Sequence, residues 1–254
     1  MSGGHDALRF HTAALTHEGL VRRYNEDAFA SIPELSLWVV ADGMGGHAAG
    51  DIASRIIVEE LASIGVPISA EDQRIRFRER LDRAHRRIRS YAAENRLDMV
   101  GATVAALMVY GTELTCGWAG DSRIYLLRKG SLTALSRDHS EVAELLAQGT
   151  ISEAEARNSP RRNVILRAIG IGQQAEPELA TGVAEPGDRF LICSDGLTEH
   201  LQDDEIARVM SREETPEAVA DNLVALTLDR GAKDNVTVVV IDASALPDAF
   251  DSGE

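Results

Sequence analysis

Short apolar runs of roughly four to eight residues recur along this chain, and such runs predict β-strands. Residues typical of turns, chiefly glycine, proline and asparagine, separate many of them. We expect strands at residues 10–16, 27–32, 36–41, 103–110, 113–118, 123–127, 132–135, 189–194 and 236–241. Several of these strands follow one another with no helix between them. This order is typical of an antiparallel meander and differs from a βαβ series.

Apolar residues spaced three and four apart predict two pairs of helices. The helices are expected at residues 47–64, 70–95, 203–211 and 216–228. Residues 138–170 are polar, with only a short helical pattern at 142–148, so we interpret them as an irregular excursion from the main sheet. The chain shows no internal repeat and no linker. We therefore expect one α+β domain over residues 1–247, followed by a frayed tail at 248–254.

The composition is ordinary for a globular protein, with 44% hydrophobic and 26% charged residues among 254. A formal net charge of −15 argues against nucleic-acid binding, which needs a basic surface. No apolar run approaches the roughly 18 residues of a membrane span, and the first ten residues lack the apolar core of a signal peptide. Cys116 and Cys193 lie in apolar, strand-like contexts. We therefore expect buried free thiols and a reducing, cytoplasmic location.

Residues 74–89 contrast with this acidic balance because they contain eight arginines. An apolar stripe at helical spacing runs through the same region and is formed by Phe77, Leu81, Ala84, Ile88 and Tyr91. The arginines occupy the other faces of the helix. We interpret them as a solvated helix surface, and the alternative is a docking site for an acidic or phosphorylated partner.

The stretch WVVADGMGGHAAGD, residues 38–51, places Asp42 at the end of an apolar run with four glycines after it. Residues 43–48 match the G-x-G-x-x-A pattern of a dinucleotide-binding turn. However, the helix predicted after this turn is followed by another helix, so the second strand of the required βαβ unit is missing. A P-loop is excluded as well, because no Gly-Lys-Ser/Thr follows.

A metal site is the other interpretation, because carboxylates recur where apolar runs begin or end. Burying such charges is costly unless they surround cations, and hard oxygen ligands suit Mg²⁺ or Mn²⁺. Taken singly, each acid could instead belong to a turn. The acids are Glu26, Asp27, Asp42, Asp121, Asp195 and Asp234. Gly43 follows Asp42, and its own carbonyl oxygen is accessible as a further ligand. The sequence has no Cys/His spacing of the kind that indicates structural zinc.

Seven segments together resemble the type 2C metal-dependent Ser/Thr protein phosphatases, the PPM family, and they occur in the family's order. They are GLVRRYNEDAF (19–29), VVADGMGGHAAGDIAS (39–54), GATVAAL (101–107), AGDSRIYLLRKG (119–130), LSRDHS (135–140), FLICSDGLTEH (190–200) and KDNVTVVVID (233–242). The set looks most like the compact bacterial branch. The resemblance implies a four-layer α-β-β-α sandwich with two central antiparallel sheets and a metal centre at one end.

The resemblance also implies ligands for two Mn²⁺ or Mg²⁺ ions. Asp42 would bridge the two ions, with the carbonyl oxygen of Gly43 on one of them. Asp195 and Asp234 would bind the other ion. Glu26 would hold the water shell of the metals, directly or through a water molecule.

Further roles follow from the same resemblance. Asp121, together with Asp195, would bind a third and weaker ion. Arg22 would grip the substrate phosphate, since a planar guanidinium suits a bidentate phosphate contact; the neighbouring Arg23 is the alternative. Residues 138–170 would form a mobile flap beside the site.

The implied reaction is hydrolysis of phosphothreonine and phosphoserine by direct attack of a metal-bridging hydroxide. The expected partners are phosphorylated proteins and a bacterial Ser/Thr kinase that the enzyme counteracts. We expect a monomer without nucleic-acid or membrane partners. A non-catalytic phosphopeptide-binding protein on the same fold is an alternative hypothesis, and a dinucleotide-dependent oxidoreductase is another.

Two positions depart from the family's common pattern. Met44 stands where many eukaryotic relatives have a histidine that is a candidate general acid, and a thioether cannot donate a proton. His47 or a metal-bound water could serve instead, so the general acid is left open. Ala102 replaces the more usual threonine, and we expect little catalytic effect from the lost hydroxyl.

Overall fold

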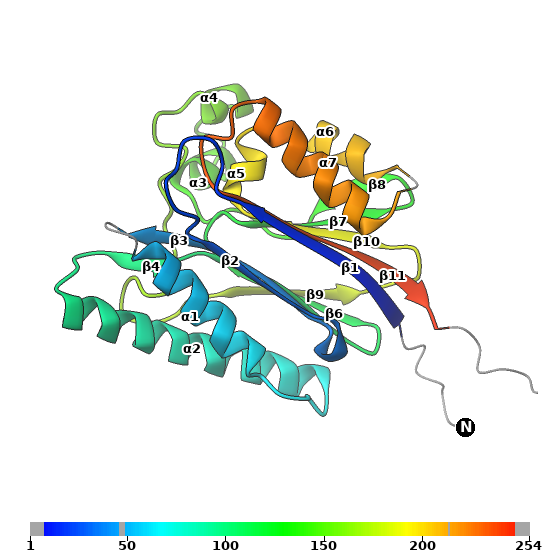
Figure 1. Ribbon diagram of the computed structural model, residues 1–254, viewed down its shortest axis with the longest axis horizontal. Helices are drawn as coiled ribbons and strands as arrows, with labels where there is room; N and C mark the ends of the chain where they lie inside the picture. Colours follow the sequence, from blue (N-terminus) through cyan, green and yellow to red (C-terminus); the bar gives the residue numbers. More distant parts are fainter. Residues whose placement is uncertain (1–7, 46–48, 213, 247–254) are drawn as a thin grey trace, which may run out of the picture.

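Two β-sheets lie face to face in the computed structural model, and helices cover the outer face of each sheet (Figure 1). The structure describes residues 8–45, 49–212 and 214–246. All strand pairs between named strands in these residues are antiparallel. The predicted four-layer α-β-β-α sandwich is therefore confirmed.

The first sheet brings the two ends of the described chain together, because β1 pairs with β11 along its whole length. Its strands, in spatial order, are β1 (Leu8–His17), β11 (Val236–Ala245), β10 (Arg189–Cys193), β7 (Arg123–Arg128) and β8 (Ser131–Ala134). The second sheet contains β2 (Asp27–Ile32), β3 (Leu37–Gly45), β5 (Val104–Tyr110), β6 (Glu113–Ala119) and β9 (Glu178–Val183), with β4 (Val100–Ala102) paired to β3.

Strand β3 shows why this sheet is buried on both faces. Its side chains alternate: Val39 and Ala41 pack under the helices, whereas Trp38 and Val40 pack between the two sheets. All four are fully buried. A strand covered on both faces reads as a continuous apolar run, which explains the sequence LWVVA.

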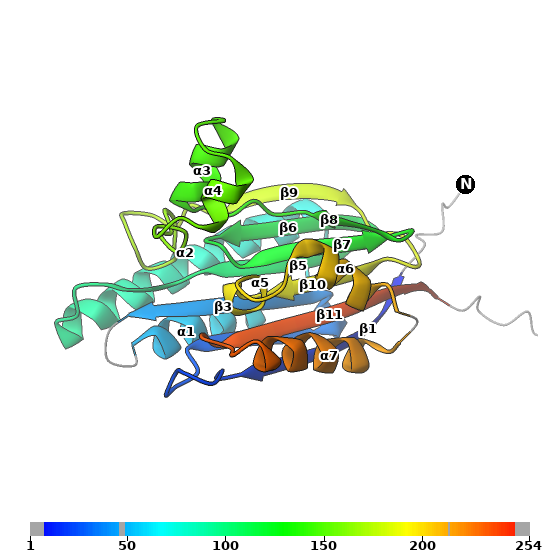
Figure 2. The same cartoon turned by 90° about the horizontal axis from the view of Figure 1, so that it is seen from above.

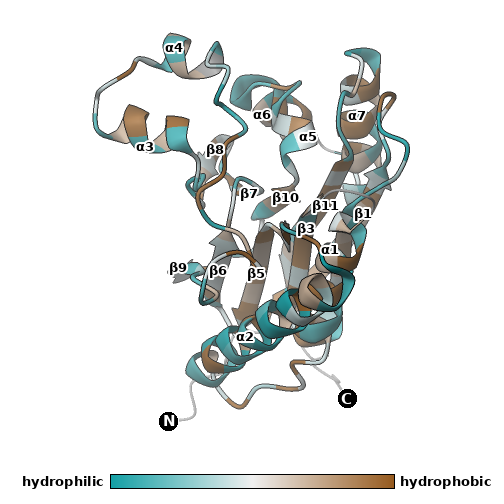
Figure 3. Ribbon diagram, turned by 90° about the vertical axis from the view of Figure 1, so that its left-hand side faces the viewer, coloured by the Kyte–Doolittle hydropathy of each residue, from teal (hydrophilic) through white to brown (hydrophobic). Residues whose placement is uncertain are grey.

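The helices fall into three groups. α1 (Gly50–Ala62) and α2 (Ala70–Asn95) cover the second sheet, and α5 (Asp195–Thr198), α6 (Asp203–Met210) and α7 (Pro216–Asp229) cover the first. α3 (Glu141–Ala147) and α4 (Glu153–Arg157) stand apart from the four layers (Figures 2 and 3). A 3-10 turn, Pro33–Leu35, joins β2 to β3.

Helix α2 follows its sequence pattern closely. Phe77, Leu81, Ala84 and Ile88 are fully buried beneath it. Several of its arginines pair with acidic side chains, among them Arg87, which reaches the exposed Glu59 at 3.1 Å and the buried Glu60 at 2.8 Å. These contacts fit the interpretation of the arginines as a solvated helix surface.

Several elements differ from the sequence predictions. β4, β9, α4 and α5 were not predicted, and β3 continues through Gly45 where an end at residue 41 was expected. β9 has the sequence ELATGV, which lacks a strong apolar pattern because it is a partly exposed edge strand. The predicted start of α1 at residue 47 and the tail at 248–254 lie outside the described residues.

Two expectations from composition can be checked directly. Cys116 and Cys193 are buried free thiols, as predicted. None of the helices within the described ranges combines the length and apolar character that crossing a bilayer requires.

Candidate metal centre and adjoining groove

The predicted acidic residues come from strand ends that meet at one end of the sandwich. Asp27 and Asp42 face each other in the β2–β3 pair. Oδ2 of Asp27 accepts hydrogen bonds from the hydroxyls of Ser194 at 2.8 Å and Thr237 at 2.7 Å, which belong to the other sheet's strand ends. Asp27 therefore joins the two sheets beside Asp42.

The backbone of Asp42 is held by Thr103, which follows β4. Thr103 donates its N–H to the carbonyl oxygen of Asp42 at 2.8 Å, and its Oγ1 accepts the N–H of Asp42 at 3.1 Å. Oγ1 of Thr103 also lies 2.7 Å from Oγ of Ser122, directly after Asp121. This network links strand β3, which carries Asp42, to the loop that carries Asp121.

The backbone packs closely around Glu26, which explains why glycines follow Asp42. The carbonyl oxygen of Glu26 accepts the N–H of Gly43 at 3.1 Å and the hydroxyl of Ser54 at 2.6 Å. Its carboxylate accepts the N–H of Gly50 at 3.2 Å. A methyl group at Gly43 would overlap the carbonyl oxygen of Gly50. The glycines let the first turn of α1 approach β3 and Glu26, and no dinucleotide is needed to explain them.

Arg22 and Asp234 form an ion pair, with Nη2 of the guanidinium 2.5 Å from Oδ2 of the carboxylate. The hydrogen bond to Asp234 raises the pKa of Arg22, and the nearby Glu26 and Asp42 act in the same direction. About half of the Arg22 side chain is exposed. The structure thus places Arg22 at the open side of the acidic cluster.

Asp195 opens helix α5 immediately after β10. Its Oδ1 is buried and, among the described residues, has no hydrogen-bond partner. Oδ1 of Asp27 is in the same situation. Buried polar atoms are normally satisfied, so two orphaned carboxylate oxygens in one region call for a ligand.

The electrostatics of the acids point to cations. Burial raises the pKa of Asp42 well above its ordinary value, and the charges of Asp27, Asp195, Asp121 and Asp234 raise it further. Burial, then Asp121, raises the pKa of Asp195 in the same way. Divalent ions would remove this mutual repulsion, and an all-oxygen donor set fits Mn²⁺ or Mg²⁺. Within the described ranges, no three acidic, histidine or cysteine side chains are already gathered around one point.

The pKa values of Asp121, Asp27 and Glu26 are raised as well. Burial raises the pKa of Asp121 to about 7, with Asp138 contributing, and that of Asp27 to about 6. Burial also raises the pKa of Glu26.

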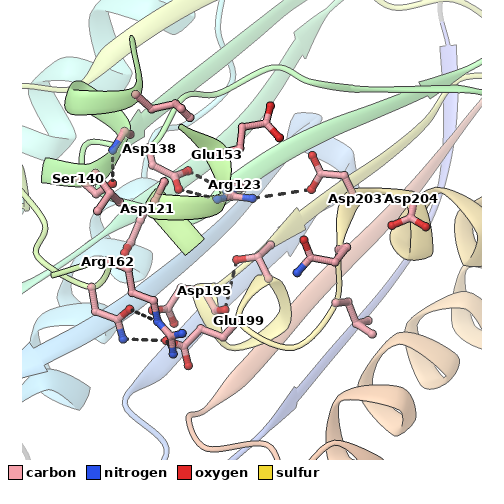
Figure 4. Close-up of a pocket in the computed structure, with 18 residues that line it drawn as sticks. Asp121, Arg123, Asp138, Ser140, Glu153, Arg162, Asp195, Glu199, Asp203 and Asp204 are labelled. Carbon is pink, nitrogen blue, oxygen red and sulfur yellow. Dashed lines mark hydrogen bonds and ion pairs between the residues drawn. The ribbon is translucent and has the colours of Figure 1, made fainter. Parts of the chain in front are cut away.

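A groove of about 560 Å³ adjoins this cluster, between the α3–α4 segment and the α5–α6 segment (Figure 4). Asp121 and Asp195 belong to its lining, so the groove is continuous with the acidic cluster. Asp42, Glu26 and Asp234 are not among the lining residues.

The structure also shows residues whose roles the sequence analysis missed. Asn235 accepts the N–H of Glu26 through Oδ1 at 2.8 Å and donates through Nδ2 to the carbonyl oxygens of Glu18 and Tyr24. Asp27 and Thr103 likewise hold the site together. The local signal for Asn235 was its place beside Asp234, which also fits an ordinary turn.

Met44 lies in β3 opposite Gly101 of β4. His47 lies outside the described residues. Ala102 pairs with Gly43 and bridges to Ile169, so its role is in the backbone.

Comparison with known proteins is consistent with this geometry. The family model described as Protein phosphatase 2C matches residues 20–227. The serine/threonine protein phosphatase PstP of Mycobacterium tuberculosis is 40% identical over 236 residues, which are 91% of this chain and 44% of that protein. The serine/threonine phosphatase Stp of Listeria welshimeri is 32% identical and covers 95% of this chain and 99% of its own.

One similar solved structure contains manganese ions. The catalytic domain of PstP in complex with two manganese ions superposes with a TM-score of 0.86 at 35% identity, covering 94% of this chain and all of that one. This chain spans less than half the length of the full mycobacterial PstP.

Proposed function

Because this chain belongs to the protein phosphatase 2C family of serine/threonine protein phosphatases, we propose that it hydrolyses phosphothreonine and phosphoserine in proteins by direct attack of water on phosphorus. The observation that carries this proposal is the convergence of Asp42, Asp121, Asp195 and Asp234 from separate elements at one end of the sandwich, close enough that the charges of Asp121, Asp195 and Asp234 raise the pKa of Asp42. The family is metal-dependent, and a structural relative holds two Mn²⁺ ions.

The acidic residues divide into three groups by their proposed roles. Asp42, the carbonyl oxygen of Gly43, Asp195 and Asp234 would hold two ions, and Glu26 would hold their water shell, directly or through a water molecule. The ions would supply an activated water and neutralise the phosphoryl oxygens. The orphaned Oδ1 of Asp195 supports this assignment.

Asp121 is proposed to hold a third, weaker ion together with Asp195. Both residues line the groove, and the charge of Asp121 is, after burial, the largest influence on the pKa of Asp195. A cation between the two carboxylates would remove this repulsion. The test below compares the activities that Mn²⁺ and Mg²⁺ support.

Arg22 is proposed to bind the substrate phosphate. In the structure its guanidinium pairs with the carboxylate of Asp234 at 2.5 Å. When Asp234 serves a metal, the guanidinium can turn to the phosphoryl oxygens, because its planar donors match them bidentately. Arg23 is exposed and, within the part of the chain that the structure describes, forms no ion pair, which favours Arg22 for this role.

The biological setting is part of the same proposal. The enzyme counteracts a bacterial Ser/Thr kinase, acts on phosphorylated proteins in the cytoplasm, and is a monomer built as one domain over residues 1–247. Residues 138–170, which include α3 and α4, act as its flap.

The decisive test is phosphate release from a phosphothreonine peptide. Wild-type protein is assayed with Mn²⁺, with Mg²⁺ and with EDTA, and Asp42→Ala is assayed with Mn²⁺. The proposal is supported if the wild-type protein releases phosphate with a metal ion, while the EDTA-treated wild type and Asp42→Ala do not. A folded wild-type protein that binds Mn²⁺ but releases no phosphate contradicts it and favours a phosphopeptide-binding role.

A further inference from the structure

The groove beside the candidate metal centre has two unlike walls. Its apolar wall comes from Val142, Ala143 and Leu146 of α3 and Ala156 of α4. Its other wall is carboxylate-rich and comes from the region of α5 and α6 (Figure 4). A groove of about 560 Å³ is large enough to hold one or two long side chains of a bound peptide.

Acidic side chains outnumber basic ones around this groove. Among the lining residues that the structure describes, seven are acidic and two are arginines. Arg123 pairs closely with Asp138, with contacts of 2.8 and 2.7 Å, and more distantly with Asp203, at 3.8 Å. Arg162 faces Glu199 at 3.5 Å. If Asp121 and Asp195 are assigned to metals, five acids still face two arginines.

The carboxylates of Asp203 and Asp204 are the most open part of the acidic wall. Their side chains are 62% and 73% exposed. Asp203 accepts a hydrogen bond from the Tyr125 hydroxyl at 2.9 Å, and Asp204 pairs with Arg208 of its own helix at 3.2 Å. Neither carboxylate is enclosed, so both have oxygen lone pairs available to an incoming donor.

We propose that this groove binds an arginine or lysine side chain of the substrate protein, close in sequence to the phosphorylated residue. This inference rests on the proposed phosphatase function. A long basic side chain suits both walls at once, because its methylene stem packs on apolar surface while its charged end reaches carboxylates. An acidic segment would meet repulsion from the same wall.

The position of the groove sets where that basic residue must lie. Asp121 and Asp195 belong both to the groove lining and to the acidic cluster, and the buried Oδ1 of Asp195 has no partner among the described residues. When a phosphorylated residue of the substrate lies at the metal centre, the residues next to it in the substrate therefore lie over the groove. An extended segment advances about 3.3 Å per residue, so the basic residue lies within a few positions.

The test compares a small substrate with a panel of peptides. Para-nitrophenyl phosphate has no flanking residues and reports the metal centre alone. Phosphothreonine peptides carry arginine, alanine or glutamate at each flanking position in turn. With Mn²⁺ at low salt, we expect kcat/KM for the best arginine peptide to exceed that of its glutamate counterpart about tenfold, as several exposed ion pairs together allow. The preference should shrink as salt rises from about 0.05 to about 0.5 M.

Two variants connect the preference to the groove. Asp204→Asn should lower the ratio of arginine-peptide to glutamate-peptide kcat/KM about two- to fivefold, and Asp204→Lys should lower it further. Asp203→Asn is a second, independent probe of the same wall. The control is Asp82→Asn, an exposed aspartate of α2 on the opposite outer layer, which should leave the ratio unchanged.

The outcomes separate the two proposals. If para-nitrophenyl phosphate is hydrolysed and all peptides have equal kcat/KM, the proposal that the groove binds a basic side chain is overturned. The phosphatase function then still stands. No hydrolysis of any substrate overturns the phosphatase function. In that case anisotropy of the labelled peptides decides the groove: tighter binding of the arginine peptides supports it, and equal binding overturns it.

Discussion

Oδ1 of Asn235 accepts the backbone N–H of Glu26 at 2.8 Å, although 209 positions separate the two residues. The same side chain donates to the carbonyl oxygens of Glu18 and Tyr24 at 2.9 and 3.0 Å. One buried amide therefore holds the turn that carries Arg22 against the start of β11. The placement of Glu26 and Arg22 beside Asp234 depends on it.

Asn235→Ala should lower the free energy of unfolding by about 2–4 kcal/mol, because three hydrogen bonds are lost and buried partners are left unsatisfied. Urea denaturation in EDTA measures this. Asn95→Ala is the matched control: Asn95 is exposed and makes one hydrogen bond, to the carbonyl oxygen of Tyr91, so its loss should cost under about 1 kcal/mol. Equal losses in the two variants would show that Asn235 does not organise the turn.

Arg22→Ala should lower kcat/KM for a phosphothreonine peptide about 10- to 100-fold, since a hydrogen bond between charged groups is worth about 1.5–3 kcal/mol. Arg22→Lys keeps the charge but not the planar fork, so it should recover only part of the loss. Steady-state kinetics with Mn²⁺ provides the measurement. Arg23→Ala is the control, and a larger loss there than in Arg22→Ala would reassign the phosphate contact.

The metal-free protein should lose stability relative to Asp121→Asn as pH rises from 5 to 8. Burial raises the pKa of Asp121 to about 7, against about 4 in an unfolded chain. Between these values the folded state binds more protons than the unfolded state, so rising pH destabilises it. The relative change should be on the order of 2 kcal/mol.

The comparison with Asp121→Asn is needed because three histidines act in the opposite direction. Burial lowers the pKa values of His85, His139 and His200, so their contribution to stability rises with pH. Urea titrations in EDTA across this range, for both proteins, cancel the histidine contribution and leave that of Asp121 together with its effect on the pKa values of Asp195 and Asp42. A difference between the proteins that is independent of pH would argue against the raised pKa. Added Mn²⁺ should stabilise the wild type most at the higher pH, where the carboxylates are charged.

Gly43→Ala should cost about 1–3 kcal/mol, since the new methyl group would overlap the carbonyl oxygen of Gly50. It should also reduce Mn²⁺-dependent activity, because relief of the overlap moves β3 or the first turn of α1. Gly182→Ala in β9 is the control. Its methyl group would come no closer than 3.8 Å to Leu114, so stability should change by under about 0.5 kcal/mol. Calorimetric melting with and without Mn²⁺ measures both, and a Gly43→Ala protein as stable as Gly182→Ala would contradict the packing argument.

Local sequence patterns were sufficient to predict the helices and strands whose buried residues recur at a regular spacing. The stripe from Phe77 to Ile88 predicted α2, and the run before Asp42 predicted β3. β9 escaped prediction because an edge strand with exposed faces needs no apolar alternation. Its existence depends on pairing with β6, which lies far away in the chain. Helix α5, four residues long, is too short to show a helical period.

By itself, the sequence determined the family, most of the strands along the chain and the candidate acids, because apolar alternation and short motifs are properties of neighbouring residues. Only the tertiary structure decided which groups meet. It paired Arg22 with Asp234, placed Asn235 under Glu26, packed Gly43 against Gly50 and opened a groove between the α3–α4 segment and the α5–α6 segment. These relationships join residues from distant parts of the chain. They come from the stacking of two sheets, and no local preference encodes them.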